Sequence, residues 1–399
     1  MENSNIIPPV PAALATAPKI GILTSGGDCP GLNAVIRGVV KSAYRMGYQT
    51  LGFIEGFEGL IEPVRYRELT PQNTSGILIQ GGTILGSTNR GRFGVTVGQD
   101  QKRSLPTELV DAVRKTFIET GLDGLVCVGG DGSLSIALEL HRAGLPVVGV
   151  PKTIDNDLSC TAFTFGFDSA VNCATDALDR LHTTASSHGR VMVLEVMGRH
   201  AGWIALHSGI AGGGDVILIP EIPWTFEGIV AKIQDRQRMG KTFTLIVAAE
   251  GAELPGGGVI TRETIQSKRQ TRLGGIGAVI TNELSNIIKQ EIRCVVLGHL
   301  QRGGGPTNFD RVLATQLGAH AVRLIVQKRF GEMVCYQPPQ IDSVPIADAV
   351  GELRRVPPDS SAVAAARAMG ISFGDSLDYV NPFATQPASQ PTQTQQLDR

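Results

Sequence analysis

Short apolar runs alternate with amphipathic stretches over most of this 399-residue chain. Apolar runs of about four to eight residues are typical of buried parallel strands, and the stretches between them carry the spacing of surface helices. Two units read as strand, glycine loop and helix: one begins KIGILTSGGDCPG at Lys19, the other DGLVCVGGDGS at Asp123. The sequence therefore predicts an α/β fold with mostly parallel sheets.

Further segments continue this alternation toward the C-terminus. We expect helices over residues 168–187, 227–240 and 310–328, and strands within RVMVLEVMG, DVILIPE, TFTLIVAAE and IRCVVLG. A break near residues 157–167 divides the chain into an α/β domain over 18–160, completed by part of 305–370, and a second α/β domain over 161–304. A Pro/Ala-rich lead-in (1–17) and a Gln/Pro-rich tail (381–399) have little to bury, so we expect both to be disordered.

Charge and cysteine content exclude several classes of protein. The net charge of −1 argues against a broad surface for nucleic acid or anionic membrane. No apolar run approaches the ~18 residues of a membrane span, and the start lacks a basic, then apolar, signal pattern. The six cysteines form no C-x-x-C pair, which indicates free thiols in a reducing compartment. We expect a cytoplasmic protein that binds neither nucleic acid nor membrane.

The two glycine loops, Gly26-Gly27-Asp28 and Gly129–Ser133, each follow a strand and precede a helix. Glycines let the backbone approach phosphate oxygens, and a helix N-terminus offers free N–H groups. Asp131 is a candidate ligand for Mg²⁺. Tight turns also need glycine, but two loops with Asp at the same place favour phosphate binding. The only Gly-Lys-Thr, at residues 240–242, lacks the first glycine of a P-loop.

The segment Pro151–Asp157 carries two carboxylates, Asp155 and Asp157, at a strand end. One is a candidate general base toward a hydroxyl and the other lies near the metal. An Asx-type turn with solvated carboxylates is the alternative.

Cationic clusters follow at Arg190, at Arg199-His200 and at Arg293 with His299 and Arg302. Surface arginines are usually only solvated. Glycine beside arginine at a strand end indicates instead a guanidinium aimed at a phosphate. Glu250, at the end of an apolar run, is a candidate acceptor for sugar hydroxyls.

Together these motifs resemble the 6-phosphofructokinases. TSGGDCPGLNAVIRG, GGTILGS, GGDGS, PKTIDND, SSHGR, MGR and LGHLQRGG occur in family order between Lys19 and Arg329. The resemblance implies two similar α/β domains facing a cleft. The first domain would bind nucleotide and the second sugar phosphate. The implied reaction is ATP- and Mg²⁺-dependent phosphorylation of the 1-hydroxyl of fructose 6-phosphate, a step of glycolysis.

The resemblance also assigns roles to single residues. Asp155 matches the proton acceptor, with Thr153 and Asp157 beside it, and Arg199 lies near the transferred phosphoryl group. The residues that bind the sugar phosphate in the family correspond to Met197, Gly198, Glu250, His299 and Arg302. Nucleotide contacts match Gly27, Gly130, Asp131 (which also matches the magnesium position), Gly132, Ser133 and Arg90-Gly91, with Asn89 as the alternative to Arg90. Arg190 and Arg293 match arginines that reach a neighbouring subunit's site, which implies a homo-oligomer, by resemblance a tetramer.

The phosphoryl donor depends on positions 132 and 152. In the family, Asp at the first and Lys at the second accompany pyrophosphate, whereas this chain has Gly132 and Lys152. A carboxylate at 132 would exclude ATP by bulk and charge, and Gly132 does not. We therefore predict ATP, with the pyrophosphate-dependent enzyme as the main alternative. A lipid or NAD kinase is disfavoured, because the arginine clusters and the PKTIDND segment would then have no function. A non-catalytic nucleotide sensor would not need both Asp155 and Asp131.

Overall fold

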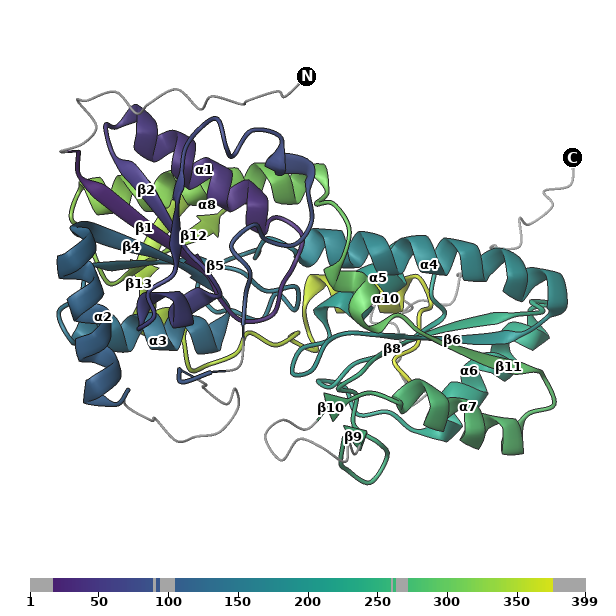
Figure 1. Ribbon diagram of the computed structural model, residues 1–399. Helices are drawn as coiled ribbons and strands as arrows, with labels where there is room; N and C mark the ends of the chain where they lie inside the picture. Colours follow the sequence, from purple (N-terminus) through teal and green to yellow (C-terminus); the bar gives the residue numbers. More distant parts are fainter. Residues whose placement is uncertain (1–16, 89–90, 94–104, 260, 263–271, 376–399) are drawn as a thin grey trace, which may run out of the picture.

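The computed structural model describes residues 17–88, 91–93, 105–259, 261–262 and 272–375. Two lobes lie side by side, each built on one sheet (Figure 1). The first sheet has the order β13-β12-β5-β4-β1-β2-β3. Its strands are β1 (Lys19–Thr24), β2 (Gln49–Phe53), β3 (Tyr66–Leu69), β4 (Leu122–Gly129), β5 (Val147–Pro151), β12 (Glu332–Gln337) and β13 (Gln340–Pro345).

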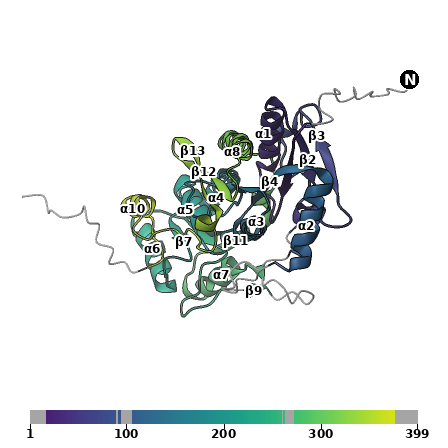
Figure 2. The same cartoon turned by 90° about the vertical axis from the view of Figure 1, so that its left-hand side faces the viewer.

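Helices cover both faces of this first sheet, with α1 and α8 on one side and α2 and α3 on the other (Figures 1 and 2). These helices are α1 (Leu32–Arg45), α2 (Thr107–Thr120), α3 (Asp131–Arg142) and α8 (Asn308–Val326). Since both faces are covered, β1, β4 and β5 are almost wholly buried, as continuous apolar runs require. A Cβ on Gly38 would lie 2.8 Å from the Thr315 carbonyl oxygen, so glycine lets α1 and α8 approach closely.

The second sheet has the order β11-β6-β8-β7, and its neighbouring strands are all parallel. Its strands are β6 (Val191–Val196), β7 (Val216–Leu218), β8 (Thr244–Ala249) and β11 (Ile292–Val296). Around it lie α4 (Phe167–His188), α5 (Trp203–Ala211), α6 (Phe226–Arg238) and α7 (Ile276–Ile287). Each strand and helix predicted from the sequence is present. The α/β prediction with mostly parallel sheets is confirmed.

The remaining described elements are short. They are the pair β9 (Thr261–Arg262) and β10 (Arg272–Leu273), the helices α9 (Ile346–Ala349) and α10 (Ser361–Ala368), and the 3₁₀ turns η2 (Gly56–Leu60), η3 (Ile77–Ile79) and η4 (Gly298–Arg302). The glycine loop predicted after β11 thus begins as a 3₁₀ turn. Among the described residues, none of the helices is long and apolar enough to span a membrane.

Residues 152–166 connect the two lobes. Ala162 N donates to Tyr336 O of β12 at 2.9 Å. The backbones of Lys152 and Phe165 form an isolated parallel β-bridge. The predicted boundary between residues 160 and 161 therefore falls inside a segment that is bonded to the first sheet.

The chain returns across both lobes through residues 351–356, here called the crossing segment. Gly351 N donates to Asp131 Oδ1 of the first lobe at 2.9 Å, and Val356 N donates to Glu221 Oε1 of the second lobe at 2.9 Å. Between them Arg354 N donates to Asp157 O at 2.8 Å. One extended segment therefore touches both lobes and the connection between them.

Candidate active site

Both glycine loops lie at one edge of the first sheet because β1 and β4 are adjacent and parallel. Ser25 N donates to Val128 O at 2.9 Å, which joins the loops where the strands end. Gly26 adopts a positive φ of 82°, a conformation that favours glycine. The carboxyl ends of parallel strands are where α/β proteins bind ligands.

The second loop opens α3. Gly130 precedes the helix without a side-chain cap, Asp131 and Gly132 are its first residues, and Ser133 is buried under Gly129. The first N–H groups of a helix lack partners within it and attract anions. Asp131 is held by the bond from Gly351 N. This geometry suits phosphate beside one carboxylate.

Lys152 lies between the two loops and is only 3% exposed. Its Nζ donates to the carbonyl oxygen of Gly27, and a Cβ on Gly26 would lie 3.5 Å from the same nitrogen. Burial lowers the pKa of the Lys152 ammonium, while nearby groups, among them Asp28 and Asp155, act in the opposite direction. Lys152 therefore puts a cation beneath the first loop.

Asp155 and Asp157 follow β5 at the same edge. Asp155 N donates to Thr153 Oγ1 at 3.1 Å, while Asp155 Oδ1 is buried and has no hydrogen-bond partner. Burial raises the pKa of the Asp155 carboxyl, and nearby positive charges oppose the rise: Arg302, His200, Lys152 and Arg199. Burial, and then the charge of Asp155, raises the pKa of Asp157 to about 7.

The second lobe brings the ends of β6 and β8 to this place. Met197, Gly198 and Arg199 follow β6, and Glu250 follows β8. Gly251 N donates to Gly198 O at 3.0 Å, and Gly198 has a φ of 135°. The charges of Arg199 and Asp155 both act on the carboxyl of Glu250, so these three side chains share one electrostatic environment.

Arg302 links the lobes. Its Nη1 donates to Asp28 O at 3.0 Å, and a Cβ on Gly27 would lie 2.8 Å from that nitrogen. Gly27 therefore leaves room for a guanidinium from the other lobe. His299, on the same 3₁₀ turn, is exposed.

Arg190 and Arg293 are not brought to this place. Arg190 immediately precedes β6 and Arg293 lies near the start of β11, so both lie at the strand ends opposite to Met197. Both pair with Glu291: Arg190 Nε lies 2.6 Å from Glu291 Oε2, and Arg293 Nη2 contacts Oε1. The hydrogen bond from Arg190 lowers the pKa of Glu291.

Two of the nucleotide candidates, Arg90 and its alternative Asn89, lie outside the described residues. Gly91 is described and lies against Glu58.

Gln301 makes a contact that the sequence did not predict, and His200, predicted only as part of a cationic cluster with Arg199, is placed more closely by the structure. Gln301, fully buried, accepts a hydrogen bond from Met197 N at 3.2 Å. His200 Nε2 is buried without a partner, and its pKa is lowered by burial and then by Arg199. Their place inside LGHLQRGG and beside MGR was the available signal.

Magnesium is compatible with these side chains. No group of three or more His, Cys, Asp or Glu side chains in the described part of the chain forms a metal cage. Mg²⁺ at phosphate sites commonly uses one or two carboxylates, phosphate oxygens and water. Asp131 is close enough to act electrostatically on Asp157, and the neighbouring Asp155 has an orphaned buried oxygen. This carboxylate set fits such an ion.

The phosphofructokinase family model matches residues 19–325. The chain belongs to the phosphofructokinase family. A protein of Chloroflexus aurantiacus named ATP-dependent 6-phosphofructokinase is 53% identical over 359 residues, which cover 90% of this chain and 98% of the relative. This similarity extends over nearly the whole of the relative, so the resemblance to 6-phosphofructokinases noted from the motifs is confirmed.

Solved structures agree with this assignment. Pichia pastoris phosphofructokinase in the T-state is 31% identical, with a TM-score of 0.70 over 84% of this chain and 37% of that chain. A pyrophosphate-dependent phosphofructokinase from Nitrosospira multiformis has a TM-score of 0.74 over 91% of this chain and 96% of that chain. It is only 20% identical, so it supports the phosphofructokinase fold alone.

The half-buried carboxyl of Glu250 makes a pH-dependent contribution to stability. Burial, and then the charge of Asp155, raises its pKa from 4.5 to about 7. A group with a raised folded-state pKa contributes fully below its unfolded value and loses that contribution as pH rises through the folded value. The loss therefore runs from about pH 4.5 to about pH 7.

We predict that Glu250→Gln, which keeps the side chain neutral, raises the thermal midpoint at pH 8 and raises it less at pH 5. Scanning calorimetry at both pH values measures the difference. Glu253→Gln, at an exposed position nearby, is the matched control. Equal shifts at the two pH values would contradict a raised pKa at Glu250.

Proposed function

We propose that this chain transfers the γ-phosphoryl group of ATP to the 1-hydroxyl of fructose 6-phosphate. The observation that carries the proposal is the buried, unpartnered oxygen of Asp155 between the two glycine loops and the cations Arg199 and Arg302. The names of the relatives support the same reaction. Asp155 supplies the base, and its surroundings suit phosphate.

In the proposed mechanism Asp155 accepts the proton of the sugar hydroxyl, whose oxygen attacks the γ-phosphorus in line. The bond from the γ-phosphorus to the bridging oxygen of the β-phosphate breaks, and ADP leaves. A carboxyl whose pKa is raised by burial is a stronger base than an exposed one. Arg199 and the N–H groups at the start of α3 stabilise charge on the transferred group. Thr153 and Asp157 fix the segment around Asp155. Asp131 would hold Mg²⁺, which neutralises phosphate charge when bound.

The sugar phosphate would lie against the second lobe. Met197, Gly198 and Glu250 face the sugar, and His299 and Arg302 contact its phosphate. Gly27, Gly91 and Gly130–Ser133 contact the nucleotide, with Arg90 beside them in the sequence.

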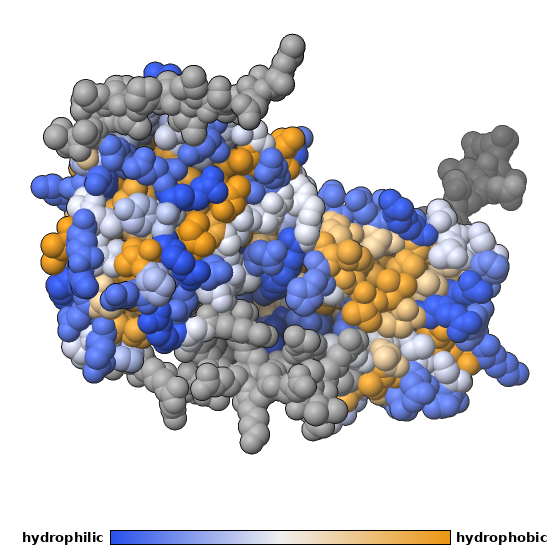
Figure 3. All heavy atoms as spheres, viewed as in Figure 1, coloured by the Kyte–Doolittle hydropathy of each residue, from blue (hydrophilic) through white to orange (hydrophobic). Residues whose placement is uncertain are grey.

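The proposed enzyme is an oligomer whose sites are shared between subunits. Arg190 and Arg293 cannot serve the site of their own chain from the far ends of β6 and β11. β11 is the edge of its described sheet, and apolar side chains near it are exposed, Val296 by 41% and Leu300 by 68%. Figure 3 shows a broad hydrophobic area on the second lobe. An unpaired sheet edge can pair with another chain, and a large exposed apolar patch is typical of an interaction site. We propose a cytoplasmic homotetramer.

The direct test is a coupled assay on fructose 6-phosphate with Mg-ATP and Mg-pyrophosphate side by side. We expect turnover with ATP. An absence of product with either donor would refute the proposed function.

Asp155→Asn should fold normally and lose turnover by about 10²–10⁴-fold, the usual cost of removing a general base. Because the amide has nearly the same shape, binding of fructose 6-phosphate, measured by calorimetric titration, should survive. Asp179→Asn, an exposed change on α4, is the control. Retention of a tenth of wild-type turnover would remove Asp155 from the mechanism.

Mixing inactive Arg293→Ala chains with inactive Asp155→Asn chains should restore part of the activity after subunit exchange. The reason is that mixed assemblies would hold some sites with an intact Asp155 and an intact partner arginine. The coupled assay measures the recovery, and each variant incubated alone is its control. A fully active monomer in sedimentation would contradict a shared site.

Gly132→Asp should sharply reduce use of ATP, because a carboxylate in the first turn of α3 would meet the nucleotide phosphates with bulk and like charge. With Lys152 already present, some pyrophosphate activity should appear. The ratio of kcat/KM for the two donors is the measurement. A wild-type enzyme faster with pyrophosphate than with ATP would show that Lys152 decides the donor.

A further inference from the structure

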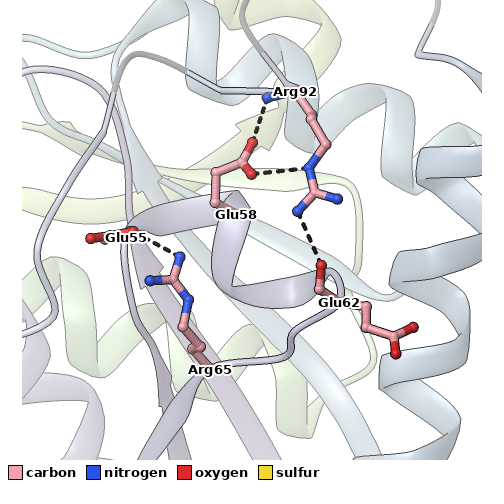
Figure 4. A network of polar contacts seen from close by, with 5 residues as sticks. All are labelled: Glu55, Glu58, Glu62, Arg65 and Arg92. Carbon is pink, nitrogen blue, oxygen red and sulfur yellow. Dashed lines mark hydrogen bonds and ion pairs between the residues drawn. The ribbon is translucent and has the colours of Figure 1, made fainter.

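The turn η2 contacts a loop of the first lobe through the side chain of Glu58 (Figure 4). Arg92 N donates to Glu58 Oε1 at 2.6 Å, and Arg92 Nε donates to Oε2 at 3.2 Å. Arg92 Nη2 also donates to Glu62 O at 3.3 Å. One carboxylate therefore holds both the main chain and the side chain of Arg92.

Close packing reinforces this contact. Gly91 has a φ of 126°, and a Cβ there would overlap Glu58 Oε1. The Phe93 ring is buried against Phe57 of η2, with centroids 5.6 Å apart. Residues 91–93 are thus fixed to η2 by polar and apolar contacts together.

Residues 87 and 88, which precede residues 91–93 in the same loop, are hydrogen-bonded to the first glycine loop. Ser87 Oγ donates to Gly26 O at 2.5 Å, and Gly26 N donates to Thr88 O at 3.3 Å. The described parts of the loop therefore lie between the proposed phosphate site and η2.

We propose that Glu58 is a positioning residue for the nucleotide: it holds Gly91 and Arg92 where the loop meets the bound ATP. The inference rests on the proposed function, in which Gly91 contacts the nucleotide. The Glu58 side chain is 16% exposed and that of Arg92 53%. An ion pair this exposed adds little stability, whereas a bond to a backbone N–H fixes the path of the main chain.

A matched control lies on the same segment. Glu55 Oε2 pairs with Arg65 Nη2 at 2.7 Å, and both side chains are about half exposed (Figure 4). This pair has the same chemistry, although Glu55 is more exposed than Glu58, and it leaves Gly91 and Arg92 untouched.

The experiment compares Glu58→Ala, Glu58→Gln, Arg92→Met and Glu55→Gln. Glu58→Ala removes these charge-assisted hydrogen bonds, and we expect their loss to raise the KM for Mg-ATP roughly tenfold. The KM for fructose 6-phosphate and kcat should stay within about twofold, because uniform binding is lost. Glu58→Gln and Arg92→Met should lie between, since each keeps the bond from Arg92 N. Glu55→Gln should match wild type.

Two readouts separate this inference from the proposed function. Calorimetric titration with Mg-ADP measures nucleotide affinity without turnover, and a thermal melt reports any general loss of structure. Weaker Mg-ADP binding in Glu58→Ala at an unchanged melting temperature supports the inference. Unchanged Mg-ADP affinity, or an equal rise in both KM values, overturns it. A wild-type chain without turnover would refute the kinase activity, and the Mg-ADP comparison would still decide the role of Glu58.

Discussion

The parallel pairing of β1 with β4, and of β4 with β5, determines where the segments of the proposed site come together. Parallel strands end at the same edge of a sheet, so the two glycine loops and the segment around Asp155 meet there, although more than a hundred residues separate the first loop from the second. Burial of these strands between helices then fixes the edge as a rigid base. The loops add the N–H groups and glycines that a phosphate needs.

Charges from both lobes converge on this edge. Lys152 comes from beneath the first loop and Arg302 reaches across from the second lobe to Asp28. These cations surround Asp155, whose buried oxygen has no partner. Burial raises the pKa of the Asp155 carboxyl and the nearby cations act in the opposite direction. This balance suits the proposed role of Asp155 as proton acceptor. Burial, and then the charge of Asp155, raises the pKa values of both Glu250 and Asp157 to about 7.

The crossing segment connects the two halves of the site at a second place. Its bonds to Asp131, Asp157 and Glu221 extend from the proposed metal position to the second lobe. The residues of the crossing segment form no motif in the sequence, because they make these three bonds with their backbone N–H groups. Such groups are present at every residue except proline, so the pattern of side chains does not report them. The contact between Glu58 and Arg92 could not be predicted from the sequence for a related reason. Two charged residues on separate segments form a contact only when the fold brings them together.

By itself the sequence determined the α/β class, the order of the strands and helices along the chain, and the family. Apolar periodicity and glycine positions are local properties, and motifs such as GGDGS and PKTIDND keep their spacing in any fold. It also named Asp155 as the candidate base. Only the tertiary structure decided that Arg302 lies on the first loop, that Gln301 supports Met197, and that Arg190 and Arg293 lie at the far ends of their strands. Those placements depend on sheet order and on contacts between residues distant in sequence, which no local pattern encodes.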